Sequence, residues 1–307
     1  MRHHWLTTGM LIVILGLFSS LCWAAPQVAV TLKPIHSLVA SLMIDVGEPQ
    51  LLLPDGASPH TFQLKPSILK ALKQADIIIW VGPELELFMV KPLEDLPAQN
   101  VIALIDTPLL TLLPLRHGRA WQHDHAHEHA ANDPAHADID PHIWLSTDNA
   151  RVMVEYLTKI LVQKDPQHQM QYQHNAQLLN DKLIALKTTL TEKLKPIEQQ
   201  PFLVYHDGYQ YFEHEFHLHG VGSIVINPHL PLSAHGLYAI KQLIAQEHVK
   251  CVFRETEFNT LMIQNSLSGT DVKIAELDPL GARIPKGPDN YQQTLLHIGE
   301  TIVQCLQ

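Results

Sequence analysis

Charged residues and cysteines are scarce in this sequence, and their scarcity narrows the classes of protein that it can encode. Charged residues make up 17% of its 307 residues, below the quarter that is usual in soluble domains. Only 21 Lys and Arg stand against 31 Asp and Glu, which gives a net charge of −10. Because binding to nucleic acid requires clustered basic side chains, this balance argues against a nucleic-acid partner. It is compatible with a cationic ligand, although net charge also simply favours solubility.

Long apolar runs are missing beyond the first two dozen residues. Met10–Phe18 is apolar but too short to span a bilayer, and it follows the basic Arg2. Together with the small residue Ala24, this pattern predicts a signal peptide over residues 1–24, export from the cytoplasm and no stable membrane insertion. A lipid-modified Cys22 is the alternative, but Leu21 stands where a small residue is normal.

The few cysteines predict one disulfide. Removal of the signal peptide leaves Cys251 and Cys305, an even pair in an oxidising compartment. A bond between them would close a loop of about 55 residues and stabilise the fold by ~4 kcal/mol if chain entropy dominates. Two free buried thiols are the alternative.

Histidine, in contrast, is abundant: the sequence has 21, and imidazole is the commonest metal-binding side chain. Residues 116–138 form a histidine-rich loop with almost no large apolar residues. Its histidines are His117, His123, His125, His127, His129 and His136. Such a segment can wrap a divalent ion, but ordering it costs conformational entropy. We therefore expect an auxiliary metal site, weaker than a preformed one; a solvated loop without this role is the alternative.

Short apolar runs alternate with amphipathic segments on both sides of this loop. The predicted strands are 28–31, 51–54, 77–81, 101–105, 202–205, 221–226, 251–253 and 272–277. The predicted helices are 34–43, 66–74, 147–163, 209–216, 233–247, 259–267 and 288–306. This alternation predicts an α/β fold of two lobes, each with a parallel sheet flanked by helices.

One helical pattern is much longer than the others. Leucines recur at spacings of three and four between Leu179 and Leu194, and the pattern continues over residues 166–197. About 30 helical residues span ~45 Å, which suits one rigid helix joining the two lobes. The expected organisation is therefore a signal peptide (1–24), an N-terminal lobe (25–165), the linking helix (166–197) and a C-terminal lobe (198–307). A single helical connection predicts only modest lobe movement when a ligand binds.

Four residues that can bind metal stand where α/β proteins place their ligands, beyond the carboxyl ends of strands. His206 and Asp278 directly follow predicted strands of the second lobe, His60 lies in a loop after a strand of the first, and His142 precedes a helix. Two candidates from each lobe predict a metal site in the cleft between them. Three imidazoles and one carboxylate suit four-coordinate Zn(II) better than Mn(II). Taken alone, a histidine after a strand is more often structural than a ligand, and Asp278 could simply start a turn.

The motifs around these residues resemble a known family. GASPHTF, DPHIWLS, FLVYHDGYQYF and ELDPLG occur in the order found in the metal-binding solute-binding proteins of bacterial ABC importers, and they are most similar to the zinc-specific members. The resemblance covers nearly the whole chain after residue 24. It implies zinc ligands at His60, His142 and His206, with Asp278 a ligand in some members only. It also implies a Cys251–Cys305 pair.

Two positions bear on which metal and which ligands the resemblance implies. Manganese-specific relatives carry Glu where this chain has His206, which favours zinc. Some zinc-specific members carry Glu before the first histidine, and Pro59 removes that ligand here.

The resemblance implies a periplasmic monomer that captures Zn(II) and delivers it to the membrane permease of an ABC zinc importer. A zinc hydrolase is the alternative from another class, since catalytic zinc also uses three protein ligands, but no H-E-x-x-H or G-x-S-x-G motif is present. A zinc buffer without a transporter and an adhesin are further alternatives.

The remaining histidines are expected to be surface or supporting residues, although a second site is an alternative for three of them: His214, His217 and His219.

Overall fold

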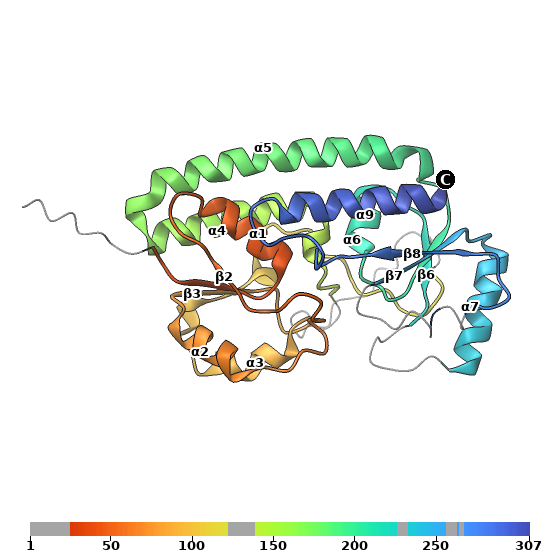
Figure 1. Cartoon of the computed structure of the whole chain (residues 1–307), viewed down its shortest axis with the longest axis horizontal. Coiled ribbons are helices and arrows are strands. Elements are labelled where there is room, and N and C mark those ends of the chain that lie inside the picture. Colours follow the sequence, from red (N-terminus) through yellow and green to blue (C-terminus); the bar gives the residue numbers. More distant parts are fainter. Residues whose placement is uncertain (1–24, 122–138, 226–232, 256–262, 264–266) are drawn as a thin grey trace, which may run out of the picture.

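The structure is a computed structural model that describes residues 25–121, 139–225, 233–255, 263 and 267–307 (Figure 1). Over these residues the chain forms two parallel four-stranded sheets, one toward each end of an elongated molecule. The two-lobed α/β architecture predicted from the sequence is confirmed. The predicted signal peptide, most of the histidine-rich loop and nearly all of the predicted helix 259–267 lie outside the described residues.

The N-terminal sheet has the strand order β2-β1-β3-β4. Its strands are β1 (Val28–Val30), β2 (Gln50–Leu51), β3 (Ile77–Trp80) and β4 (Val101–Ala103). β3 is buried along its whole length, which is why its sequence is a continuous apolar run. β2 is shorter than its apolar run predicts, although the N–H groups of Leu52 and Leu53 still donate to the carbonyls of Val30 and Thr31 at 2.8 and 3.2 Å.

The C-terminal sheet repeats this arrangement with the order β6-β5-β7-β8. Its strands are β5 (Phe202–Val204), β6 (Gly220–Ser223), β7 (Cys251–Glu255) and β8 (Lys273–Leu277). The strand order reverses between β5 and β7, because β6 lies on one side of β5 and β8 lies beyond β7. In sheets of this kind the crevice at such a reversal, beyond the carboxyl ends of the strands, is where ligands bind.

Helices cover both sheets and connect the lobes. They are α1 (Lys33–Leu42), α2 (Pro66–Gln74), α3 (Leu87–Glu94), α4 (Thr147–Lys164), α5 (Gln169–Leu194), α6 (Gln210–Glu215), α7 (Ala234–Gln246) and α9 (Asn290–Leu306). Ser146 caps α4, where its side chain accepts a hydrogen bond from the N–H of Asn149 at 3.1 Å. The helix α3 was not predicted, because Pro92 lies inside it and proline normally ends a helical pattern.

The long helix α5 runs alongside both lobes, as predicted (Figure 1). Its 26 residues continue into 3-10 turns at Pro166–His168 and Lys195–Ile197. The leucine stripe that predicted this helix is buried from Leu179 to Leu194. Because every helical residue adds ~1.5 Å, α5 alone spans ~39 Å.

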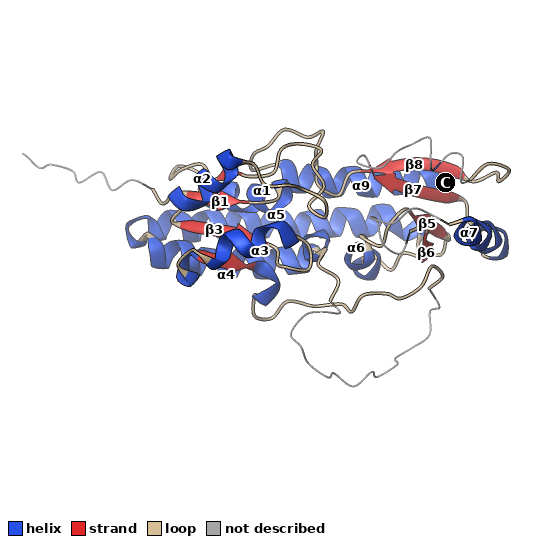
Figure 2. Ribbon diagram, turned by 90° about the horizontal axis from the view of Figure 1, so that it is seen from below, coloured by secondary structure: helices blue, strands red, loops and turns tan. Residues whose placement is uncertain are grey.

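The C-terminal helix α9 also bridges the lobes, packing against α1 and α5 as well as β8 (Figures 1 and 2). Gly299 permits the close approach of α9 to α5, because a Cβ atom there would lie 2.6 Å from Leu190. One continuous apolar core contains buried residues of both lobes, and a smaller one lies within the C-terminal lobe. This shared core and the paired helices fix the lobes against one another, which limits wide opening of the cleft.

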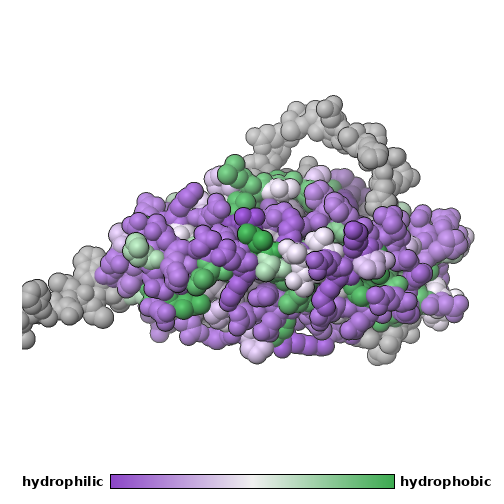
Figure 3. All heavy atoms as spheres, turned by 90° about the horizontal axis from the view of Figure 1, so that it is seen from above, coloured by the Kyte–Doolittle hydropathy of each residue, from purple (hydrophilic) through white to green (hydrophobic). Residues whose placement is uncertain are grey.

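The face seen in Figure 3 is mainly hydrophilic, and its apolar side chains are scattered in small groups. Among the described residues, no helix is long and apolar enough to cross a bilayer.

Candidate metal centre

The first predicted ligand, His206, lies at the strand-order reversal of the C-terminal sheet. It follows β5 after one residue, Tyr205, whose N–H still donates to the carbonyl of Phe253 at 2.7 Å. Nδ1 of His206 lies 2.7 Å from Oε1 of Glu255, the last residue of the neighbouring strand β7. Glu255 is 1% exposed and His206 is 5% exposed, so the imidazole is oriented by a buried carboxylate.

The second predicted ligand, His142, has the same kind of partner. Its Nδ1 lies 2.7 Å from Oδ1 of Asp140, which also accepts the backbone N–H of His142 at 3.0 Å. Asp140 is itself fixed, because its N–H donates to the carbonyl of Leu113 and its carbonyl accepts the hydroxyl of Tyr211. Both histidines therefore direct their other ring nitrogen, Nε2, toward each other.

The third predicted ligand, His60, closes the group from the loop between β2 and α2. Its ring centroid lies 5.4 Å from that of His142 and 5.5 Å from that of His206, while those two rings are 5.3 Å apart. One ligand nitrogen from each ring lies within 4.8 Å of the other two. Three imidazoles from both lobes thus surround one point, as the sequence predicted.

The chemistry of this group favours a bound cation. The carboxylates at Nδ1 select the tautomer with a proton on Nδ1, so Nε2 of His142 and Nε2 of His206 both carry lone pairs. These two atoms lie 3.4 Å apart, and without a shared proton their lone pairs repel each other. Two nitrogens bound tetrahedrally to zinc at ~2.05 Å are separated by about 3.3 Å. The observed separation therefore matches the edge of a zinc tetrahedron.

Gly208 keeps this space open. A Cβ atom at position 208 would lie 2.9 Å from Nε2 of His206 and 3.3 Å from Nε2 of His142. An ion bonded to both nitrogens needs this volume, so the absence of a side chain at this position fits a metal site.

The fourth predicted ligand, Asp278, follows β8 as expected but is not part of the group of three histidines. Its Oδ2 accepts the N–H of Arg283 at 3.1 Å. Its Oδ1 is buried without a hydrogen-bond partner, and the residue is 6% exposed. An unsatisfied buried carboxylate oxygen is costly and favours a cationic partner.

The histidine-rich loop lies mostly outside the described residues, which include His117 but not His123, His125, His127, His129 or His136. His117 is exposed. The segment that leads into the loop crosses to the C-terminal lobe, where the N–H of Ser223 donates to the carbonyl of Arg119 and the N–H of Trp121 donates to the carbonyl of Val221. Gly222 allows this contact, because a Cβ atom there would collide with the Arg119 carbonyl.

Arg116 anchors the same segment beside the metal centre. Its guanidinium pairs with Asp207, the neighbour of His206, and with Glu213, and it stacks on Trp121 with 3.3 Å to the ring centroid. Burial alone would lower the pKa of Arg116, but the two carboxylates outweigh burial and raise it above its usual range. Arg116 therefore stays charged and holds the segment against the C-terminal lobe.

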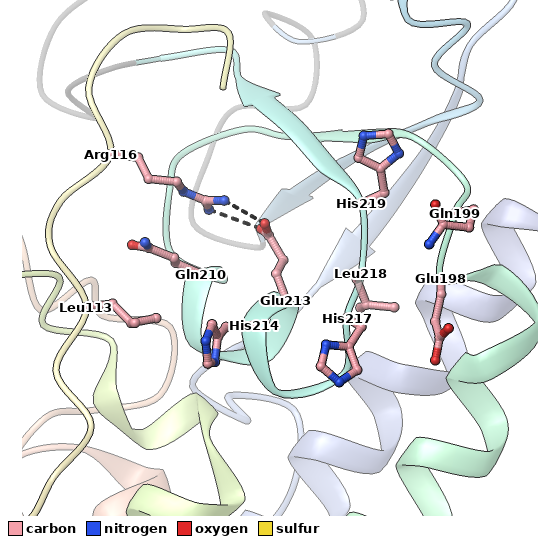
Figure 4. A pocket seen from close by; sticks show the side chains of 10 residues that line it. All are labelled: Leu113, Arg116, Glu198, Gln199, Gln210, Glu213, His214, His217, Leu218 and His219. Atoms are coloured by element: carbon pink, nitrogen blue, oxygen red, sulfur yellow. Dashed lines mark hydrogen bonds and ion pairs between the residues drawn. The ribbon is translucent and has the colours of Figure 1, made fainter. Parts of the chain in front are cut away.

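The histidines around α6 do not form a second centre within the described residues. His214, His217 and His219 line a cavity of about 590 Å³ next to Arg116 (Figure 4). In that view His219 lies apart from His214 and His217, and the three are not a group whose ligand atoms lie within 4.8 Å of one another. His36 is also structural, because it is buried in α1 with Nε2 2.9 Å from the carbonyl of Pro49.

Sequence reasoning missed the two carboxylates that orient the histidines. Glu255 ends a strand, so the carboxyl-end rule that found His206 could have found it too. Asp140 belongs to the DPH motif of His142 and was treated only as part of that motif.

The predicted disulfide between Cys251 and Cys305 is present and ties the start of β7 to the end of α9. It joins residues 54 positions apart and so fixes α9 to the C-terminal sheet.

Two α/β lobes that share long bridging helices, with three histidines converging between them, are the architecture of a metal-binding solute-binding protein. The solved structures that this chain resembles have the same fold. A crystal structure of ZnuA superposes with a TM-score of 0.76 at 23% identity, covering 92% of this chain and 100% of that one. The periplasmic zinc-binding protein TroA from Treponema pallidum gives 0.76 at 20% identity, covering 92% and 99%.

Sequence comparison identifies the family. Residues 28–305 match the family model described as zinc-uptake complex component A, periplasmic. The high-affinity zinc uptake system protein ZnuA of Brucella abortus (strain 2308) is 34% identical over 313 residues, covering 94% of both chains. The ZnuA of Yersinia pestis is 32% identical over 315 residues, covering 100% of this chain and 99% of the other. The chain belongs to the ZnuA family; it is therefore a periplasmic binding protein and not an enzyme.

Proposed function

We propose that this protein captures Zn(II) in the periplasm with His60, His142 and His206 and delivers it to the membrane permease of an ABC zinc importer. The observation that carries the proposal is the pair of Nε2 atoms 3.4 Å apart, each on an imidazole whose other nitrogen faces a buried carboxylate. Zinc uptake is also what the names of its relatives describe. The protein acts as a monomer, and its net charge of −10 speaks against nucleic acid as a partner.

Asp278 is the proposed fourth partner of the ion. Three neutral imidazoles and one carboxylate leave a net charge of +1 on the zinc centre. The buried Oδ1 atom supports this assignment because it has no other hydrogen-bond partner. Water in the fourth position is the alternative, and it would leave the zinc affinity of an Asp278→Asn variant unchanged.

The histidine-rich loop is the proposed auxiliary collector of zinc, with lower affinity than the cleft. Deletion of residues 122–136 removes five of its histidines and keeps the anchored residues up to Trp121. One tight zinc ion should remain in this variant while weaker binding disappears. Loss of the tight ion would show that the primary site had been placed wrongly.

Metal content and calorimetry test the cleft site directly. Wild-type protein should bind one tight Zn(II) ion, measured by native mass spectrometry and by titration against a competing chelator. His206→Ala should lose tight binding, because only two imidazoles remain to hold the ion. The matched control is His174→Ala, which removes an exposed histidine of α5. Unchanged stoichiometry and affinity in His206→Ala would reject the proposed site.

A further inference from the structure

The three histidines of the candidate centre differ in their burial and in how firmly the surrounding structure holds them. His142 and His206 are each 5% exposed and each faces a buried carboxylate. His60 is only half-buried and comes from a segment without helix or strand, residues 52–65. His60 is therefore the one of the three rings that can move away most easily.

The segment before His60 is joined to α1 by one ion pair, and its Pro59 is buried. Two of its backbone hydrogen bonds are local: the N–H of Ala57 donates to the carbonyl of Pro54 at 3.2 Å, and the N–H of Thr61 donates to that of Ser58 at 3.3 Å. Its Asp55 forms an ion pair with Nζ of Lys33, the first residue of α1. Lys33 is 6% exposed, whereas Asp55 is 65% exposed.

Lys33 at the same time holds the segment that follows Asp278. Its Nζ donates to the carbonyls of Gly281, Ala282 and Ile284, all at 3.1 Å. One ammonium group therefore connects the segment that carries His60 with the segment that carries Asp278. Side chains of both segments line one small cavity next to Lys33.

Of the four contacts of the Lys33 ammonium group, the one to Asp55 can break most easily, because Lys33 has only three N–H donors. An ammonium group has three N–H donors, and the three carbonyls can accept all of them. All three N–H donors of Lys33 thus stay hydrogen-bonded when Asp55 moves away, and water can solvate the exposed Asp55 carboxylate. The ion pair can therefore open and close without leaving an N–H donor of Lys33 unsatisfied.

We propose that the Lys33–Asp55 ion pair is a latch that holds the His60 segment closed over the metal and sets the rate at which zinc leaves. This inference rests on the proposed function, because His60 must be a ligand for the latch to matter. A partner that displaces Asp55 from Lys33 would release zinc without separating the two lobes.

Zinc release from the full-length protein tests the latch. Zinc-loaded wild type and Asp55→Asn are mixed with an excess of chelator, and release is followed by stopped flow. Asp55→Asn should release zinc about three- to tenfold faster, because the segment loses its attraction to Lys33. Thermal unfolding of the zinc-free protein should shift only slightly, by the contribution of this single, half-exposed ion pair. Asp55→Glu restores the charge and should return the rate close to that of wild type.

Glu48→Gln is the matched control. Glu48 also forms an ion pair with the segment after Asp278, to Lys286 at 2.9 Å, but it is not on the His60 segment. Its removal should leave the release rate unchanged. An Asp55→Asn rate equal to that of wild type, or an equal increase in both variants, would overturn the latch. Absence of zinc binding by the wild type would instead overturn the proposed function.

Discussion

The carboxylate of Glu255 should strengthen zinc binding although it does not touch the ion. The perturbation is Glu255→Gln, which keeps an oxygen near Nδ1 of His206 but removes the negative charge. Both side chains are buried, at 1% and 7% exposure, and their atoms are 2.7 Å apart. A carboxylate that orients a metal-binding imidazole typically contributes about 10–100-fold in metal affinity. Loss of its charge with the amide retained predicts a roughly tenfold higher Kd for zinc, or ~1.4 kcal/mol.

Competition titration with a chromophoric chelator measures this change, and unfolding of the zinc-free variant shows whether it is specific. The free energy of unfolding without zinc should not fall, because the substitution removes a buried charge. Glu276→Gln is the control: it makes the same change on the neighbouring strand β8, where Glu276 pairs with Arg254 instead of a histidine. A zinc Kd of Glu255→Gln within twofold of wild type would refute the reasoning, as would an equal loss in Glu276→Gln.

Three further predictions follow from the structure. Gly208→Ala should weaken zinc binding by about 100-fold in chelator competition while the zinc-free protein stays folded, because the new methyl group would lie 2.9 Å from Nε2 of His206. Reduction of the Cys251–Cys305 disulfide should lower the free energy of unfolding by ~4 kcal/mol in denaturant titrations, since the bond closes a loop of 54 residues; an unchanged midpoint would contradict this. Burial raises the pKa of Glu86 to about 7 from its usual 4.5, so between these values the folded state keeps a proton that the unfolded state loses. Stability should therefore fall as pH rises through this window, by on the order of 3 kcal/mol, and Glu86→Gln should flatten the profile of unfolding free energy against pH.

The fold could be predicted from local sequence because burial leaves a clear pattern. Ile77–Trp80 lies in the interior of a covered sheet, so it is apolar at every position. The buried stripe from Leu179 to Leu194 required a long helix. The helix α3 could not be predicted, because it contains Pro92 and a proline in the sequence normally indicates the end of a helix. Tertiary packing tolerates the proline here.

The convergence of the three histidines could be predicted, but the side chains that orient and surround them could not. The place of His206 in the candidate site could be predicted from one rule alone, that ligands bind beyond the carboxyl ends of strands. Its pairing with Glu255 depends on β5 and β7 being neighbours, although β6 lies between them in the sequence, and spacing does not reveal this order. Lys33 is similar: it lies just before the predicted helix 34–43, whereas its carbonyl partners lie about 250 residues further along the chain.

The contact between Arg119–Trp121 and β6 has a consequence for solubility. β6 is the outer strand of its sheet, and an outer strand with unpaired backbone groups is a template for aggregation. The segment that leads into the histidine-rich loop occupies the backbone of Val221 and Ser223 on this edge. Any shortening of the loop that also removes Arg119–Trp121 should therefore make the protein self-associate. Its aggregation would then be a defect of the exposed sheet edge, independent of how many zinc-binding histidines are lost.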